Sequence, residues 1–399
     1  MSVLSKARGA KRVALPVAAA TVAITMVAAC SSGGSAGGST GSTQKIEIGT
    51  ISDLSGPASV IGLAGQEGQK IAESLINKDP KTYLGSADRS LTLSYSDASN
   101  APAQAVTVAR QYIQDGKVSG IIGPLYTAQA QALAPITTQA KIPLLVPYTP
   151  GSQALTNLGD FVFASSQPDQ RTVQTAITAM TKQFPNDKTI GIVYGSDSAA
   201  HIPLAAFAKQ AITAAGLTPV EFSLPFASLD YNSAISTLQS KGVQAIYICS
   251  NSPAIAAAMQ QAERSNYHPH WVGYSTMFDQ SVITAGGPQA AGAILTSDYD
   301  PTLQKPLADT FRQQYQATYH KAPNSWAALG FQSVMTTAAA IAAIPGKVTG
   351  QALRDAMQNV KATAVVGDGT FTFDQQRLTS EPPAVLTIRD NTFQRVSGS

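Results

Sequence analysis

The glycine-rich segment SDLSGPASVIGLAGQEGQKIA, residues 52–72, joins a short apolar run to a predicted helix and has the composition of a phosphate-binding loop. A dinucleotide fingerprint needs G-x-G-x-x-G directly after the strand. Here nine residues separate Ser52 from Gly62, which makes the loop too long for that turn, and no G-x-x-x-x-G-K-S/T occurs in the sequence. We therefore interpret the segment as the wall of a pocket for a small extracellular solute.

Asp97 ends the next predicted strand, where a nucleotide site would place its ribose-binding acid. The favoured interpretation is an aspartate that precedes a helix, with Asn100 as the N-cap of that helix.

Two further loops each carry a tyrosine followed by a threonine, in GPLYTAQ (123–129) and VPYTPG (146–151). A helix is predicted to begin at Thr127, where free N–H groups and the helix dipole favour an anion. The alternative is that Thr127 is only the N-cap of this helix. Tyr126 and Tyr148 provide aromatic faces with polar tips, which suit a pocket for an amphipathic solute, or they pack beneath their loops.

Short apolar runs alternate with helical segments from residue 45 onward. Strands are predicted at 45–52, 91–97, 119–123, 142–147, 189–194, 218–224, 244–249 and 270–274. Helices are predicted at 65–78, 100–115, 126–140, 169–183, 199–215, 230–241 and 252–265, before a largely helical stretch at 304–360 and strands at 370–374, 383–389 and 392–396. Continuous Ile/Val runs indicate parallel strands that are covered on both faces. Because the alternation occurs twice, the predicted fold class is α/β, with two doubly wound lobes.

The first 29 residues have the pattern of a secretory signal, with four basic residues before the apolar run VALPVAAATVAITMVAA. This run ends against Cys30 in a motif that resembles a bacterial lipobox, which predicts lipidation of Cys30. A plain transmembrane anchor is the less favoured alternative, because the run is shorter than the ~20 residues of a spanning helix. The Ser/Gly-rich segment that completes residues 30–44 reads as a flexible tether.

Charge and cysteine content exclude several classes of function. Four of the 27 basic residues lie in 1–29, which leaves 23 basic against 24 acidic residues and gives no basic patch for a nucleic-acid partner. Cys249 lies in the apolar run QAIYICS and is predicted to be a buried core residue. No metal site and no catalytic motif such as G-x-S-x-G stands out, so we predict no metal, no cofactor and no enzymatic activity.

The order and spacing of five segments resemble the type I periplasmic binding proteins of the leucine/isoleucine/valine-binding kind, the solute receptors of ABC importers. These segments are IGTISDLSGPASVIGLAGQEGQKIAESLIN, SDASNAPAQAVTVARQYIQDGKVSGIIGPLYT, IPLLVPYTPGSQALT, FVFASSQPDQRT and VVGDGTFTFDQQ. The resemblance implies two lobes joined by three hinge crossovers, near 165–168, 297–299 and 374–377, with the ligand bound between them. Lobe 1 would comprise 45–166 plus 298–375, and lobe 2 would comprise 167–297 plus 376–399.

The resemblance also implies roles for individual residues. Thr127 and Thr149 match positions where hydroxyl and N–H groups hold a ligand carboxylate. Asp169 matches a position that often binds an ammonium group, although an aspartate at a helix N-terminus needs no ligand. Ser275 stands where a second acid is expected, which favours a neutral or carboxylate-only solute. Ile61, in the opening loop, either covers the ligand or packs within its loop.

Three residues on strand-end loops of lobe 2 are candidate ligand contacts: Asp197, Asn251 and Tyr274. Together these features predict a monomeric, lipid-anchored protein on the outer face of the cell membrane. It would close around an amino acid, amide or carboxylate and deliver it to an ABC permease. The alternatives are a ligand-binding sensory subunit and an extracytoplasmic hydrolase on the same scaffold.

Overall fold

A computed structural model describes residues 43–396 of the protein, apart from residues 57 and 199. The predicted signal sequence, Cys30 and nearly all of the predicted tether therefore lie outside the described residues. None of the described helices is long and apolar enough to cross a membrane.

The N-terminal sheet has five parallel strands in the order β2-β1-β3-β4-β5. Its strands are β1 (Gln44–Ser52), β2 (Arg89–Asp97), β3 (Val118–Ile122), β4 (Leu144–Pro150) and β5 (Val162–Ser166). The helices that follow these strands in the chain are α1 (Ser59–Lys78), α2 (Pro80–Leu84), α3 (Pro102–Asp115), α4 (Thr127–Gln139) and α5 (Gln153–Thr156). The order reverses between β1 and β3, so this sheet is doubly wound as predicted.

The second sheet has seven strands in the order β14-β13-β10-β9-β8-β6-β7. Its parallel strands are β6 (Thr189–Gly195), β7 (Thr218–Leu224), β8 (Ala245–Cys249), β9 (His270–Gly273) and β10 (Ile294–Ser297), and they repeat the order of the first sheet. The antiparallel strands β13 (Ala384–Arg389) and β14 (Thr392–Arg395) extend it beyond β10. The intervening helices are α6 (Asp169–Gln183), α7 (His201–Ala214), α8 (Asn232–Ser240), α9 (Ser252–Arg264), the 3-10 helix η1 (Ser275–Met277), α10 (Gln280–Gly286) and η2 (Gly287–Ala290).

Three further helices and a small hairpin follow β10, and several of them return to the first sheet. They are α11 (Pro306–Tyr319), α12 (Ser325–Ala342), α13 (Gly350–Gln358), β11 (Lys361–Thr363) and β12 (Thr370–Thr372). The chain thus passes between the lobes after β5, after β10 and before β13. Both lobes belong to one structural unit, residues 42–399.

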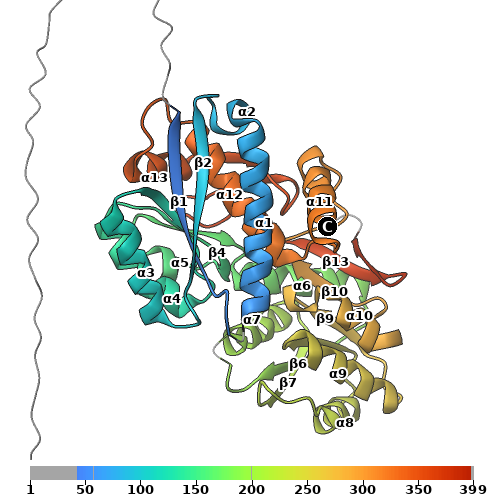
Figure 1. The fold of residues 1–399 in the computed structure, drawn as a ribbon. Helices are drawn as coiled ribbons and strands as arrows, with labels where there is room; N and C mark the ends of the chain where they lie inside the picture. The colour runs from blue at the N-terminus through green and yellow to red at the C-terminus, as the bar shows by residue number, and fades with distance from the viewer. Residues whose placement is uncertain (1–42, 57, 199, 397–399) are drawn as a thin grey trace, which may run out of the picture. The chain divides into compact units, whose positions relative to one another are not determined.

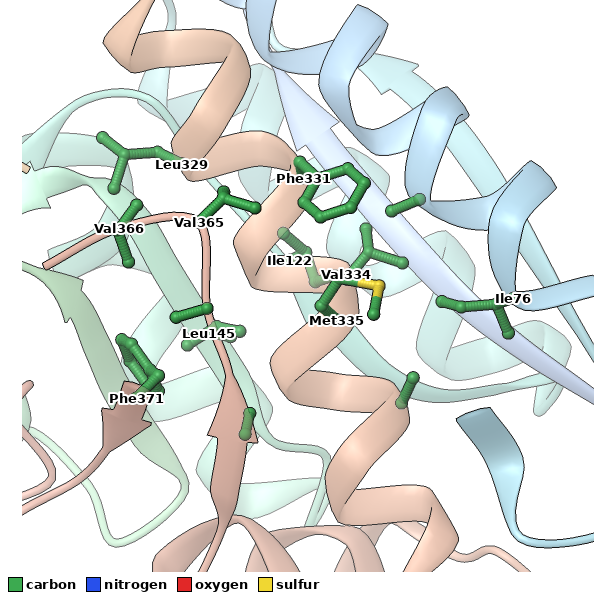
Figure 2. Close-up of a cluster of buried hydrophobic side chains, with 14 of the residues drawn as sticks. Ile76, Ile122, Leu145, Leu329, Phe331, Val334, Met335, Val365, Val366 and Phe371 are labelled. Carbon is green, nitrogen blue, oxygen red and sulfur yellow. The ribbon is translucent and has the colours of Figure 1, made fainter. Parts of the chain in front are cut away.

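Buried side chains cover both faces of each sheet, as the continuous apolar runs predict. Figure 2 shows one such region, where Phe331, Val334 and Met335 of α12 face Ile122 and Leu145 of the first sheet. Cys249 of β8 is fully buried, as predicted, and is a free thiol.

Helix α1 lies along α12, and its glycines explain the segment that resembled a phosphate loop (Figure 1). Helix α1 begins at Ser59, so Gly62, Gly65 and Gly68 are helical residues, and the prediction of a loop up to Gly62 is wrong. A Cβ on Gly68 would lie 1.9 Å from the carbonyl oxygen of Ala327. Gly68 therefore permits close packing of α1 on α12, while a Cβ on Gly62 would lie 2.0 Å from the carbonyl oxygen of Asp53, so the space beside these glycines is filled by the protein itself.

The predicted N-cap at Asn100 is also wrong. Helix α3 has Ala101 at its N-cap and Pro102 at its first position. Asn100 instead has a positive φ of 56° and donates its backbone N–H to Asp53 Oδ1 at 2.6 Å. An asparagine tolerates this left-handed conformation, which lets the chain turn before the helix.

Candidate ligand-binding site

A cavity of about 280 Å³ lies among loops and helix N-termini that follow the strands of both sheets. This volume is near the lower end of the range ~300–1,000 Å³ that is typical of small-molecule sites. Its lining is mainly apolar and hydroxyl-bearing: Ile61, Leu125, Tyr126, Thr127, Tyr148, Thr149, Pro150, Ser166, Gln167, Asp169, Thr172, Ala200, Tyr274, Ser275, Thr276, Thr296, Ser297, Asp298, Ser325, Trp326, Leu329 and Pro383. The position agrees with the rule that α/β sheets bind ligands beyond the carboxyl ends of their strands.

Seven of the nine residues that the sequence proposes as ligand contacts line this cavity: Ile61, Tyr126, Thr127, Tyr148, Thr149, Asp169 and Tyr274. Ile61 reaches it from the first turn of α1, not from a loop.

Asp197 and Asn251 do not line the cavity, because local hydrogen bonds engage both side chains. Asp197 Oδ1 accepts the N–H of Phe226 at 2.6 Å, and Asn251 Oδ1 caps α9 by accepting the N–H of Ala254 at 3.0 Å.

A chain of hydrogen bonds holds the N-terminus of α4 at the cavity. Gln129 accepts the backbone N–H of Tyr126 through Oε1 at 3.1 Å and donates from Nε2 to Asp53 Oδ1 at 3.0 Å. Tyr126 is the N-cap and Thr127 the first helical residue, so the alternative that Thr127 is the N-cap is wrong. The first N–H groups of α4 have no partner within the helix, which makes this end a site for an anion.

The two threonines differ in what they can offer a ligand. Thr149 is 3% exposed, and its hydroxyl already donates to the carbonyl oxygen of Leu125 at 3.1 Å. Thr127 is exposed, and its hydroxyl has no hydrogen-bond partner among the described residues. Of this pair, Thr127 is therefore the available hydroxyl donor for a carboxylate.

Tyr148 and Trp326 form an aromatic wall, with ring centroids 6.5 Å apart. Gln69 of α1 donates to the Tyr148 hydroxyl at 3.4 Å. A Cβ on Gly65 would lie 2.2 Å from that hydroxyl oxygen, so this glycine leaves the space that Tyr148 occupies. Burial raises the pKa of Tyr148, so the phenol stays neutral.

Tyr274 contributes a phenol from the other lobe, at the end of β9. Its hydroxyl pairs with His201 Nε2 at 3.1 Å. Burial lowers the pKa of His201 to about 4, in spite of the opposing effect of Asp197, so the imidazole is neutral at pH 7. Burial also raises the pKa of Tyr274. Tyr274 therefore presents a neutral phenol to the cavity, and the hydrogen bond with the neutral imidazole of His201 orients it.

Two carboxyl groups line the cavity, from Asp169 at the start of α6 and Asp298 directly after β10. Asp298 Oδ1 accepts the backbone N–H of Gln167 at 3.0 Å. Burial and then the charge of Asp298 raise the pKa of Asp169 to about 7, and burial raises the pKa of Asp298 to about 6. The sequence analysis missed Asp298, which brings a second carboxyl group to the cavity from the end of β10.

The lining residues that sequence reasoning missed include two at the end of β10 and two at the start of α12. Ser297 and Asp298 lie at the end of β10, a strand that the sequence analysis did not predict, so the strand-end rule could not select them. Ser325 and Trp326 lie in the first turn of α12, about 180 residues beyond Tyr148 in the chain, where this helix covers the first sheet. No local signal marks them. Among the described residues no group of three His, Cys, Asp or Glu side chains is placed to bind a metal.

The fold and the cleft define a two-lobed binding protein. A family model described as periplasmic binding protein matches residues 45–392, and the chain belongs to this family of extracytoplasmic binding proteins, with the type I fold. It is therefore a binding protein and not an enzyme.

Individual relatives are distant in sequence. A leucine-, isoleucine-, valine-, threonine- and alanine-binding protein from Pseudomonas aeruginosa is 22% identical over 276 residues, which cover 68% of this chain and 72% of the relative. The crystal structure of a leucine-binding protein from Thermotoga maritima matches with a TM-score of 0.74 and 22% identity, over 88% of this chain and 98% of the other. A solute-binding protein from R. palustris in complex with benzoate matches with a TM-score of 0.74 and 20% identity, over 88% and 95% of the two chains.

Proposed function

We propose that this protein captures a small zwitterionic solute with an apolar side chain and delivers it to an ABC importer. The observation that supports this most directly is the distribution of charge around the cleft. The N-termini of α4 and α12, which have no acidic residue in their first turns, face it from lobe 1. Asp169 faces it from the start of α6 in lobe 2, and Asp298 faces it from the second chain crossing. A carboxylate is favoured at the helix ends and an ammonium group beside the acids.

The remaining lining accounts for the apolar part of the solute. Ile61, Leu125, Leu329 and the aromatic wall of Tyr148 and Trp326 supply apolar surface, and the cavity volume suits a molecule of amino-acid size. The relatives include proteins named for aliphatic amino acids and one in complex with benzoate. The acid pair favours the first kind of ligand for this chain, because a benzoate has no group for it.

The proposal includes an anchor at Cys30 and closure of the two lobes about the three chain crossings. The anchor predicts that the wild-type protein fractionates with membranes and that its N-terminal peptide carries acyl chains. Cys30→Ser should release the protein from the membrane fraction without changing ligand affinity. Mass spectrometry showing an unmodified Cys30 on secreted protein would contradict the anchor alone and leave the binding function standing.

The binding function is tested with purified protein, L-leucine, L-isoleucine and benzoate. A ligand at one hundred times its dissociation constant adds about 2.7 kcal/mol to stability, which a thermal-shift assay detects. L-Leucine or L-isoleucine should raise the melting temperature, and calorimetry should show weaker binding to Thr127→Ala. Asp197→Asn is the matched control, because Asp197 does not line the cavity. Equal affinity in Thr127→Ala and wild type would refute the carboxylate site at α4.

A further inference from the structure

Asp298 uses its two carboxylate oxygens differently. The residue is 9% exposed and lines the cleft, and its Oδ1 is held by the backbone N–H of Gln167. Within the described part of the chain, no side chain donates a hydrogen bond to the carboxylate of Asp298 or of Asp169. Two carboxyl groups therefore enter one cavity with acceptor positions left for a ligand.

Among residues 43–396 that the structure describes, no salt bridge joins a cation to either carboxyl group. The cavity lining among the described residues contains no Lys, Arg or His. Arg171, two residues further along α6, donates instead to the carbonyl oxygens of Thr379 and Glu381 at 2.8 and 3.2 Å. A buried carboxylate without a cation is costly, and two of them repel each other.

The other titratable groups that sense Asp169 are neutral. Tyr247 and Cys249 on β8 and Tyr274 after β9 all have raised pKa values, caused first by burial and also by the charge of Asp169. Tyr126 and Tyr148, which line the cavity from lobe 1, are neutral phenols as well, because burial raises both pKa values. Asp169 and Asp298 are therefore the groups here that change charge near pH 7.

We propose that at least one of Asp169 and Asp298 holds a proton while the cleft is empty, and that this proton passes to the solvent when the cationic nitrogen of the ligand enters. This inference rests on the proposed function. It adds to that function a second acid, Asp298, and the exchange of a bound proton for the cationic nitrogen of the ligand. The nitrogen donates its N–H groups to the carboxylate oxygens, and the displaced proton passes to water. Binding therefore tightens as the pH rises.

Asp298 also connects this exchange to the chain crossings. Gln167 lies in the first crossing and donates its backbone N–H to Asp298. Its side-chain Nε2 donates to the carbonyl oxygen of Glu381 at 2.8 Å, in the third crossing. The carbonyl oxygen of Asp298 accepts the N–H of Gly367 at 3.0 Å. The residue that meets the ligand's charge thus belongs to the hydrogen-bond network that joins all three crossings.

The first experiment needs no ligand and compares Asp169→Asn and Asp298→Asn with the wild type by thermal unfolding at several pH values. The folded pKa values are raised, so the folded protein binds protons between about pH 4 and 7 that the unfolded chain does not bind. This contribution to stability is present at low pH and is lost as the pH rises through 6 to 7. Each Asn variant should therefore melt a few degrees (~2–5 °C) above the wild type at pH 8.5, and the gain should shrink as the pH falls and vanish near pH 4.

Asp115→Asn, at the exposed end of α3, is the control and should show no such gain. If neither cleft variant gains stability over the wild type as the pH rises, the proposal that the empty cleft holds a proton is overturned, whatever ligand the protein binds.

The second experiment measures L-leucine binding by calorimetry at pH 6.5 in phosphate and in Tris, whose ionisation enthalpies differ. Wild-type protein should release a proton on binding, seen as a buffer-dependent enthalpy, and its affinity should rise between pH 6 and 8.5. Asp298→Asn should release less than the wild type and bind about 10- to 100-fold more weakly, as expected for loss of a charged hydrogen bond. Binding without a buffer-dependent enthalpy overturns the exchange.

The third arm uses 4-methylpentanoate, which is leucine without its amino group, and 3-methylbutylamine, which lacks the carboxylate. At pH 8.5 the wild type should bind 4-methylpentanoate at least tenfold more weakly than L-leucine, and Asp298→Asn should narrow that ratio. If neither L-leucine nor the amine raises the melting temperature at pH 8.5, the cation subsite is overturned. Failure of the binding function alone would instead leave the ligand-free pH effect of the Asn variants intact.

Discussion

Gly68 of α1 and Ala327 of α12 touch backbone to backbone: a Cβ added to Gly68 would lie 1.9 Å from the carbonyl oxygen of Ala327. The contact is reciprocal one turn away, because a Cβ on Gly330 would lie 2.1 Å from the carbonyl oxygen of Gly65. Small residues at such crossings allow helix axes to approach closely. The start of α12, which carries Trp326 into the cleft, is thereby fixed against α1.

Gly68→Ala should lower the free energy of unfolding by about 1–3 kcal/mol, because the obstacle is backbone that cannot rotate away. Alanine is intrinsically better than glycine in a helix by about 1 kcal/mol, so the steric effect has to exceed that gain. Urea denaturation measures the change. Gly346→Ala is the control, since nothing lies within 4 Å of its added Cβ, and it should stay within about 0.5 kcal/mol of wild type. Equal stability of the two variants would contradict the backbone contact.

Arg89 joins the ends of α2 and α12 to the start of β2. It is 8% exposed and donates five hydrogen bonds, to Gln44 Oε1 and to the carbonyl oxygens of Leu84, Ile341, Ile344 and Gly346. A lysine keeps the charge but not the planar fork. Arg89→Lys should therefore cost about 2–4 kcal/mol of stability in urea denaturation, because several buried carbonyls lose their donors.

The exposed Arg110→Lys on α3 is the comparison for this change and should be neutral within about 0.5 kcal/mol. An Arg89→Lys variant with the stability of the wild type would show that an ammonium group serves these carbonyl oxygens equally well.

Gln129 positions the α4 end of the cleft without lining it. Gln129→Leu removes the acceptor for the Tyr126 N–H and the donor to Asp53 Oδ1. The Tyr126 N–H and the Asp53 carboxylate then each lose their hydrogen bond with residue 129. We expect a stability loss of about 1–3 kcal/mol and at least tenfold weaker binding of L-leucine by calorimetry. Gln104→Leu, an exposed substitution on α3, should change neither quantity. If Gln129→Leu lowers stability but leaves affinity unchanged, the N-terminus of α4 has no part in binding.

Local sequence signals predicted much of the fold. The helix predicted at 169–183 and the strand predicted at 218–224 coincide with α6 and β7, because hydrophobic periodicity depends on nearby residues. The start of α1 was not predictable in this way. Its N-cap, Ala58, has no capping side chain, and Gly68 is explained only by its contact with α12, about 260 residues further along the chain.

The residues of the candidate site were likewise predicted in part by sequence signals and in part missed. The strand-end rule and the family resemblance placed Tyr126, Tyr148 and Tyr274 at the cavity. The same rule selected Asp197 and Asn251, which turn back to cap their own loop and helix. Whether a strand-end side chain faces the cleft or its own backbone depends on turn geometry that the sequence does not encode locally.

His201 provides a pH-dependent prediction that is independent of the acid pair. Its Nε2 is bound to Tyr274, its Nδ1 is buried without a partner, and its ring packs against Phe226 at 5.0 Å. Burial lowers its pKa from 6.5 to about 4, so the unfolded chain binds a proton that the folded protein does not bind between those values. This contribution to stability is complete above pH 7 and is lost as the pH falls from 6.5 towards 4.

His201→Phe keeps a ring in this place and removes the titration, so the wild type should lose stability relative to the variant as the pH falls from 7 to 5. Thermal unfolding at matched ionic strength measures this difference. At pH 7.5 the variant should also bind L-leucine more weakly, because the Tyr274 hydroxyl loses the partner that orients it. His320→Asn, at an exposed C-cap with a positive φ that asparagine tolerates, should follow the wild-type pH profile. If the wild type and His201→Phe keep a constant difference from pH 7 to 5, the pKa of His201 is the same in the folded and the unfolded protein, and burial does not exclude a proton from this imidazole.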